Sequence, residues 1–338
     1  MNTKTQSKSS VLLWIVLIAL LLVLALGAFL ATSLRVVVIS GSDESFVLRP
    51  SQFRMGILYI DDDATAVFRE KSHWLGPVIS DHGKLTVEND VTITGPIILA
   101  NESLQLRENT IVQGSVYLFN GSLTIEQGAS VRHNAVLFNG CVTQAQNTSI
   151  RGNVVLFNGG LALQDKASVR GDTLLFNGYL WLGQEAIVYG KSIVFMGEMK
   201  LAPKAVLRND AVLLYGNVYL SPEALVRGDM FVVKGDANLD GQSKISGKLY
   251  LNSDAERLHK SPEAQITRGV IRPVNIESTA DWRVAAYFIG HFAKLLTLPA
   301  VAFFVLLVLI FFVGRYSRSR KMNMYHPAQN IDAVASNP

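Results

Sequence analysis

Residue types that catalyse reactions or bind metals are present in this sequence but are scattered. Its six histidines share no common spacing, and the single cysteine, Cys141, can form neither an internal disulfide nor a multi-cysteine metal site. No glycine-rich phosphate loop and no nucleophile motif occurs. The run Asp61-Asp62-Asp63 could contact a cation, although an acidic turn is the simpler interpretation. We therefore predict a protein that is not an enzyme and has no catalytic residue, metal site or cofactor.

Arginines offer a different chemistry, because they recur at multiples of nineteen residues. A regular structure with that period would place them on one edge, where they could bind a polyanion such as anionic lipid or polysaccharide. The alternative is an ion-pair ladder with Asp172, Asp210 and Asp229, which would contribute little stability at a surface. Both interpretations stay open. The arginines are Arg132, Arg151, Arg170, Arg208 and Arg227.

The arginines belong to a nineteen-residue repeat that fills the middle of the chain. Nine units cover residues 77–247 without an insertion, and a tenth begins at Lys248. A glycine and a preceding phenylalanine or other apolar residue keep the same step, and so do four asparagines. We expect these asparagines to form a structural ladder at a bend, where amides bond from one unit to the next. They are Asn120, Asn139, Asn158 and Asn177.

Each unit alternates apolar and polar residues with a period of two, as in Leu161-x-Leu163 and Ala167-x-Val169. Nineteen residues are too few for a helix pair, and three short strands with tight turns fit them well. A left-handed hexapeptide helix would need an eighteen-residue period with a six-residue sub-repeat, which is not visible. We predict an all-β soluble core, a parallel β-helix (solenoid) of about nine 19-residue coils. The carboxylate clusters of β-helical carbohydrate enzymes are absent.

One strand of each unit is apolar on both faces, and only one face can point into a coil. The other face is expected to form an outer apolar stripe, which is unusual for a monomeric soluble protein. Either residues 33–76 or 248–282 fold over it, or it contacts a second copy or the bilayer. The predicted self-association stripe is Val154, Leu156, Leu175 and Leu213.

Two charge-free apolar segments of twenty residues each, 11–30 and 295–314, lie near the ends of the chain. Each is long enough to cross a bilayer core of ~30 Å at ~1.5 Å per residue, which predicts one transmembrane α-helix at each end of the core. A cleaved signal peptide is the alternative for the first, but its apolar run should be only about 7–15 residues.

The domain boundaries follow from these segments. The predicted order is a basic tail (1–10), a transmembrane helix (11–32), a β-rich N-terminal cap or subdomain (33–76), the β-helix (77–251), a C-terminal cap or linker (252–282), an interfacial lead-in with the second transmembrane helix (283–314) and a basic tail (315–338). Whether the caps close the ends of the β-helix stays open.

The chain has a net charge of +4, but its basic excess lies in the tails. The tails hold six basic residues and one acid, which leaves the rest of the chain at −1. This distribution excludes nucleic acid as the expected partner and indicates membrane flanks. The positive-inside bias favours cytoplasmic tails and an extracytoplasmic β-helix at a bacterial inner membrane, with a cytoplasmic β-helix as the alternative.

Over residues 77–251 the stack of short apolar coils, with recurrent V-x-G-[DN] and L-x-[LIV] elements, resembles the bactofilins, bacterial polymer-forming β-helix proteins. The resemblance implies nucleotide-independent head-to-tail assembly and a scaffold role in cell shape or envelope organisation. The expected partners are the lipid bilayer, further copies of the chain in an oligomer or polymer, and envelope-synthesis proteins. The second membrane segment departs from the family pattern and favours short assemblies. The alternative function is an envelope binding module that uses the arginine edge.

Overall fold

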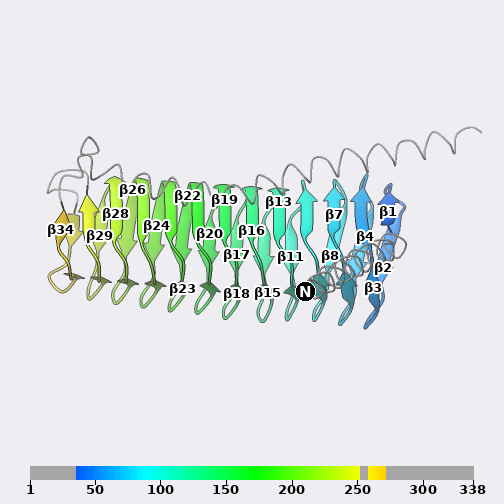
Figure 1. Ribbon diagram of the computed structural model, residues 1–338, viewed down its shortest axis with the longest axis horizontal. Helices are drawn as coiled ribbons and strands as arrows, with labels where there is room; N and C mark the ends of the chain where they lie inside the picture. The colour runs from blue at the N-terminus through cyan, green and yellow to red at the C-terminus, as the bar shows by residue number, and fades with distance from the viewer. Residues whose placement is uncertain (1–35, 252–257, 272–338) are drawn as a thin grey trace, which may run out of the picture. The chain divides into compact units, whose positions relative to one another are not determined.

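The described part of this computed structural model, residues 36–251 and 258–271, is a parallel β-helix, as the repeat predicts (Figure 1). Every pairing between strands of the described residues is parallel, and most join residues nineteen positions apart, such as Val154↔Thr173 and Ser149↔Ser168. In-register pairing places like residues above one another in columns, with neighbouring coils about 4.8 Å apart. Each coil has three strand segments, and the pairings make sheets of 19, 12 and 3 strands.

The first strand of each coil carries the Asn and Phe columns and belongs to the 19-stranded sheet. These strands are β1 (Val36–Ser40), β4 (Ile57–Asp61), β7 (Val78–Asp81), β10 (Ile97–Ala100), β13 (Val116–Asn120), β16 (Ala135–Asn139), β19 (Val154–Asn158), β22 (Thr173–Leu182), β24 (Ser192–Leu201), β26 (Ala211–Leu220), β28 (Met230–Lys234), β31 (Leu249–Leu251) and β34 (Val270–Ile271). Three of them, β22, β24 and β26, run ten residues each because they include the second segment of their coils.

The remaining strands form the other two walls of the coils. The second strands are β2 (Ser45–Leu48), β5 (Thr65–Phe68), β8 (Lys84–Val87), β11 (Leu104–Leu106), β14 (Leu123–Ile125), β17 (Val142–Gln144), β20 (Leu161–Leu163), β29 (Ala237–Leu239) and β32 (Leu258–Lys260). The third strands are β3 (Phe53–Met55), β6 (His73–Leu75), β9 (Thr92–Thr94), β12 (Ile111–Val112), β15 (Ser130–Val131), β18 (Ser149–Ile150), β21 (Ser168–Val169), β23 (Ile187–Val188), β25 (Val206–Leu207), β27 (Leu225–Val226), β30 (Lys244–Ile245) and β33 (Gln265–Ile266).

The stack is longer than predicted, with about twelve coils instead of nine. Residues 36–76, expected as a separate cap, form coils of the same solenoid, because β1 pairs with β4 and β4 with β7. These coils escape a nineteen-residue search because their steps are 21 residues from Val36 to Ile57 and 20 from Leu58 to Val78. Residues 258–271, expected as a cap or linker, form the last coil, 21 residues from their partners.

One continuous apolar core runs through all coils, built from the inward side chain of each strand. Leucine, isoleucine and valine line its walls, and the alanine column Ala129, Ala167, Ala186, Ala205 and Ala224 is buried where the walls converge. In the first coils, aromatic side chains fill part of the core in place of aliphatic ones. Phe46 contacts Phe68 and Trp74 edge-on, at 6.4 and 5.7 Å between ring centroids.

Two kinds of corner turn the chain within a coil. At the glycine corner, between the first and second strands, seven glycines have φ between +136° and +158°. At the left-handed corner, between the second and third strands, non-glycine residues have φ of 56–63°. The glycine corner is Gly121, Gly140, Gly159, Gly178, Gly197, Gly216 and Gly235; the left-handed corner includes Ser51, Lys71, Asp90, Asn109, Asn147, Lys166, Glu185, Lys204 and Glu223.

Both predicted membrane segments, both basic tails and the 252–257 and 272–282 parts of the predicted linker lie outside the described residues. Within residues 36–251 and 258–271 there is no helix with the length and apolar character to cross a bilayer.

Candidate functional site

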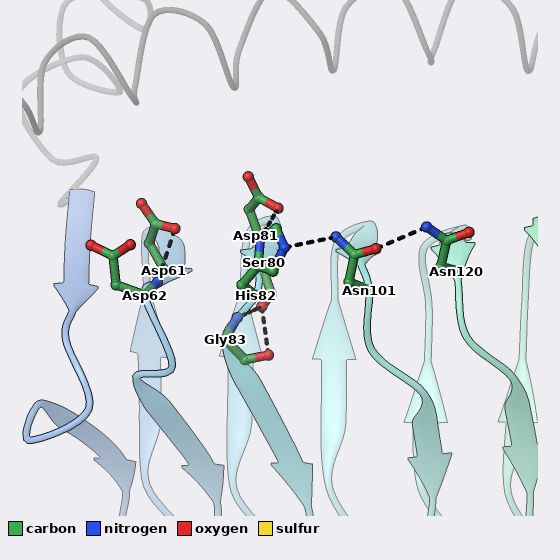
Figure 2. Close-up of polar contacts among 8 residues, drawn as sticks. All are labelled: Asp61, Asp62, Ser80, Asp81, His82, Gly83, Asn101 and Asn120. Carbon is green, nitrogen blue, oxygen red and sulfur yellow. Dashed lines mark hydrogen bonds and ion pairs between the residues drawn. The ribbon is translucent and has the colours of Figure 1, made fainter.

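The predicted asparagine column forms a continuous chain of side-chain hydrogen bonds just before the glycine corner. Each amide nitrogen donates to the amide oxygen one coil earlier: Asn139 to Asn120 at 2.9 Å, Asn158 to Asn139 at 3.3 Å and Asn177 to Asn158 at 3.2 Å. The chain extends to Asn101, which accepts from Asn120 at 2.8 Å (Figure 2). All these amides therefore point the same way, and their role is to tie coils together.

At its N-terminal side this chain of amides ends on a histidine that the sequence search left unassigned. Asn101 Nδ2 donates to His82 Nε2 at 3.2 Å, and His82 Nδ1 lies 2.9 Å from Asp81 Oδ1 (Figure 2). Both contacts fit the neutral tautomer with its proton on Nδ1. The nearby Ser80 hydroxyl is bonded to the backbone of Gly83, as donor at 3.0 Å and as acceptor at 3.1 Å. These residues hold a turn and present no activated nucleophile.

The acidic run Asp61-Asp62-Asp63 forms a turn, with φ of 50° at Asp62 and 63° at Asp63. Asp62 Oδ2 accepts a hydrogen bond from the Ser40 hydroxyl at 2.8 Å. Among the described residues, no group of three or more His, Cys, Asp or Glu side chains is arranged to hold a metal ion.

Glu102 occupies the column that is glycine in the following coils. Its Oε1 accepts a hydrogen bond from the Leu85 backbone N–H at 2.6 Å, while its Oε2 is buried with no partner among the described residues. Burial raises the pKa of this carboxyl to about 7, against the smaller opposing effects of the Leu85 N–H, the Lys84 charge and the Ser80 hydroxyl. Glu102 therefore titrates near neutrality at a corner where the next seven coils have glycine.

The five predicted edge arginines are exposed in one column at the corner that joins the third strand to the next first strand. Among the described residues, the alternative of an ion-pair ladder between these arginines and the neighbouring aspartates is not formed. Asp172, Asp210 and Asp229 instead accept hydrogen bonds from backbone N–H groups of the next coil, at 2.7–3.0 Å. In the described ranges, Arg132, Arg151, Arg170, Arg208 and Arg227 make no ion pair within 4.0 Å. Tyr189 fills the gap in the column, with the Arg208 guanidinium 4.5 Å from its ring centroid.

The prediction of an exposed self-association stripe at Val154, Leu156, Leu175 and Leu213 was wrong, because all four are fully buried in the core. Side chains alternate along a strand, and both alternating sets are apolar here, so the sequence could not decide which set points inward. The outward set includes a column of stacked rings, Phe119, Phe138, Phe157, Phe176 and Phe195, with centroids 4.7–5.1 Å apart. These rings are half-buried, and Val155 and Leu174 beside them are buried.

Exposed apolar side chains instead concentrate in two places that the sequence search did not single out. One is the first coil, where Val36, Val47, Phe53 and Met55 are 38–57% exposed. The other lies on the ten-residue strands, with Tyr179, Trp181, Met196 and Tyr215. A signal for the second was present, because Met196 and Tyr215 replace asparagine in the ladder column.

Comparison with protein-family models, curated proteins and solved structures finds no match.

Proposed function

We propose that the protein is a membrane-anchored, bactofilin-like structural scaffold that self-associates through its β-helix and organises the cell envelope or cell shape. The observation that carries this proposal is the unpaired strand edge of the first coil. Among the described residues β1, β2 and β3 each pair with a strand on one side only. An unpaired strand edge is a template for another chain, and this one also exposes apolar side chains.

The last coil provides a complementary edge. Within the described ranges β32, β33 and β34 also pair on one side only, with β29, β30 and β31. Edges at both ends of one stack support head-to-tail, heterologous association, which continues as a filament when it does not close. No nucleotide is needed for such pairing, because backbone hydrogen bonds and apolar burial supply the free energy.

Light scattering of the full chain in detergent tests this proposal. We expect the particle mass to rise with protein concentration without nucleotide. The variant Val47→Lys/Phe53→Lys should stay monomeric, because lysines on an edge strand oppose pairing. As a control, Glu126→Lys places the charge on the side of a central coil and should assemble normally. A mass that is constant with concentration in the unmodified chain would contradict self-association.

The proposed membrane arrangement has two spans, with cytoplasmic tails and the β-helix outside the cytoplasmic membrane. Labelling of intact cells with a membrane-impermeant maleimide tests it, using Glu263→Cys in a Cys141→Ala background because Glu263 is exposed in the last coil. Labelling in intact cells is expected. Labelling only after lysis would place the β-helix in the cytoplasm.

A second candidate function is polyanion binding by the arginine edge. It is favoured by the acids bonding to backbone N–H groups, which leaves five exposed cations in line. We expect salt-sensitive binding of the full chain to vesicles that contain anionic lipid or to an acidic polysaccharide. Replacing Arg151, Arg170 and Arg208 by Ala should abolish it. Retained binding in that triple variant would exclude the arginine edge as the site.

A further inference from the structure

Large aromatic and apolar side chains are exposed together on β22, β24 and β26. Tyr179, Trp181, Met196 and Tyr215 are 43, 38, 52 and 53% exposed, and Tyr219 is half-buried beside them. We call these five residues the aromatic platform. Soluble proteins rarely expose such groups in one contiguous patch unless it binds something.

The platform lies on both sides of the glycine corner of three neighbouring ten-residue strands. Each runs unbroken for ten residues, and the β22–β24 and β24–β26 pairings continue in register through Gly178, Gly197 and Gly216. Trp181 pairs with Lys200, and Lys200 with Tyr219. Aromatic and polar side chains therefore alternate along this column at about 4.8 Å per strand.

The Tyr179 ring presents a face to solvent. A Cβ atom added to Gly160 would lie 2.2, 2.3 and 2.6 Å from Cζ, Cε1 and Cε2 of this ring. These similar distances mean that the ring lies over the glycine backbone of the preceding coil, with its hydroxyl 4.0 Å from Cys141 Sγ. A side chain at residue 160 would lift the ring, so Gly160 keeps one face supported and the opposite face open.

Polar groups stand between the rings. Lys200 Nζ lies 2.6 Å from Glu198 Oε2 and 5.2 Å from the centre of the Tyr219 ring. Glu198 pairs in register with Tyr179 on one side and Asn217 on the other. The platform thus offers a carboxylate, an ammonium and an amide within one strand spacing of an aromatic surface.

We propose that the aromatic platform binds a polysaccharide. The apolar C–H face of a pyranose ring fits the negative face of an aromatic ring, and the hydroxyl groups around its edge need donors and acceptors. Tyr179 and Trp181 would stack against sugar rings, and Glu198, Lys200 and Asn217 would bond the hydroxyls. Asn217 would do so through its Nδ2 group, because its Oδ1 accepts a hydrogen bond from the Asp236 N–H at 3.0 Å. A protein partner that inserts an apolar side chain would bind less tightly, because it would have to cover the charged Glu198–Lys200 pair in the middle of the platform.

Retention on insoluble glycans tests this proposal with the full chain in detergent. The probes are peptidoglycan, chitin and cellulose, at high salt so that the arginine edge does not contribute. We expect retention on at least one of them. Trp181→Ala and Tyr179→Ala should each weaken it at least about tenfold, as for removal of an aromatic hot spot.

Tyr189→Ala is the matched control, because Tyr189 is as exposed as Trp181, at 38%, but lies on the arginine edge. It should bind normally. Circular dichroism spectra and thermal unfolding curves like those of the unmodified chain would show that the variants fold. Three results would overturn the proposal: no retention of the unmodified chain on any probe, full retention by the platform variants, or equal loss in Tyr189→Ala. Dissociation of an oligomer by Trp181→Ala without glycan retention would assign the platform to a second copy instead.

Discussion

The glycine corner and the left-handed corner both turn the chain within a coil, but they differ in whether they accept a side chain. At the glycine corner a Cβ atom on any of the seven glycines would lie 1.5–2.0 Å from a carbonyl oxygen of the preceding coil. At the left-handed corner φ is also positive, yet lysine, glutamate and asparagine occur there with exposed or half-exposed side chains. The glycine corner therefore requires glycine for two reasons: a φ of +136° to +158° is rarely adopted by residues with a side chain, and the preceding coil leaves no room for a Cβ atom.

Of the substitutions that test this difference, Gly197→Ala should reduce stability the most. Its added Cβ would lie 1.5 Å from the Gly178 oxygen at a φ of +140°, so two coils would have to separate. We expect the free energy of unfolding to fall by about 3 kcal/mol or more, measured by denaturant unfolding. Lys204→Ala at the other corner is the control, and an equal loss there would remove the distinction between the corners.

Glu102→Gln examines a side chain that stands in the glycine column. Because the pKa of Glu102 is raised in the folded protein to about 7 from 4.5, ionisation costs stability: its contribution is complete below about pH 4.5 and is lost as the pH rises through 7. Glutamine should therefore stabilise the protein at pH 8, by an amount of order 1 kcal/mol after solvent screening, and have little effect at pH 4. Thermal unfolding at both pH values measures this, and a benefit independent of pH would contradict it.

Asn139→Ala removes one amide from the ladder beside the glycine corner. It takes away one donated and one accepted hydrogen bond, to Asn120 and from Asn158. Because the site is exposed and water can replace the partners, we expect a loss of about 1 kcal/mol. Asn139→Asp keeps the size but removes the donor, and it should be no more stable than Asn139→Ala if the hydrogen-bond direction matters.

Lys71→Asn should give the smallest effect, in the opposite direction. Lys71 has a φ of 56°, a conformation that asparagine adopts more readily than lysine. We expect the free energy of unfolding to rise by about 0.5 kcal/mol. Lys84→Asn, in the neighbouring strand β8, should give no gain, and a loss of stability at Lys71 would show that this corner also restricts side chains.

The regular coils could be predicted from the sequence because one period carries both the strand pattern and the column identities. The coils whose steps lengthen to 20 or 21 residues, as between Val36 and Ile57, could not be predicted, because one or two added residues in a turn shift every column. Side-chain direction could not be predicted either where both faces of a strand are apolar, as at Val154 and Val155. There, the direction of a side chain depends on the corner that precedes it, which composition does not reveal.

Site residues could be placed from the sequence where they repeat at a constant step, and not where they occur once. Asparagines and arginines at a constant step could be placed on edges, because stacking requires it. A comparison of repeated residues alone misses the aromatic platform, because Tyr179 and Trp181 break their columns and Met196 and Tyr215 replace the asparagine of the ladder column. Departures from the consensus of a repeat are thus the more informative signal for binding surfaces.

In-register stacking also bears on how the chain is made. Each strand finds its partners 19–21 residues earlier, so no pairing has to wait for a distant part of the sequence. Few all-β proteins share this property, because their sheets usually join remote segments and form slowly. At a synthesis rate of roughly 5–20 residues per second, a ribosome would deliver one new coil about every one to four seconds. Each coil could close on the one before it as it emerges, in the order in which it is translated.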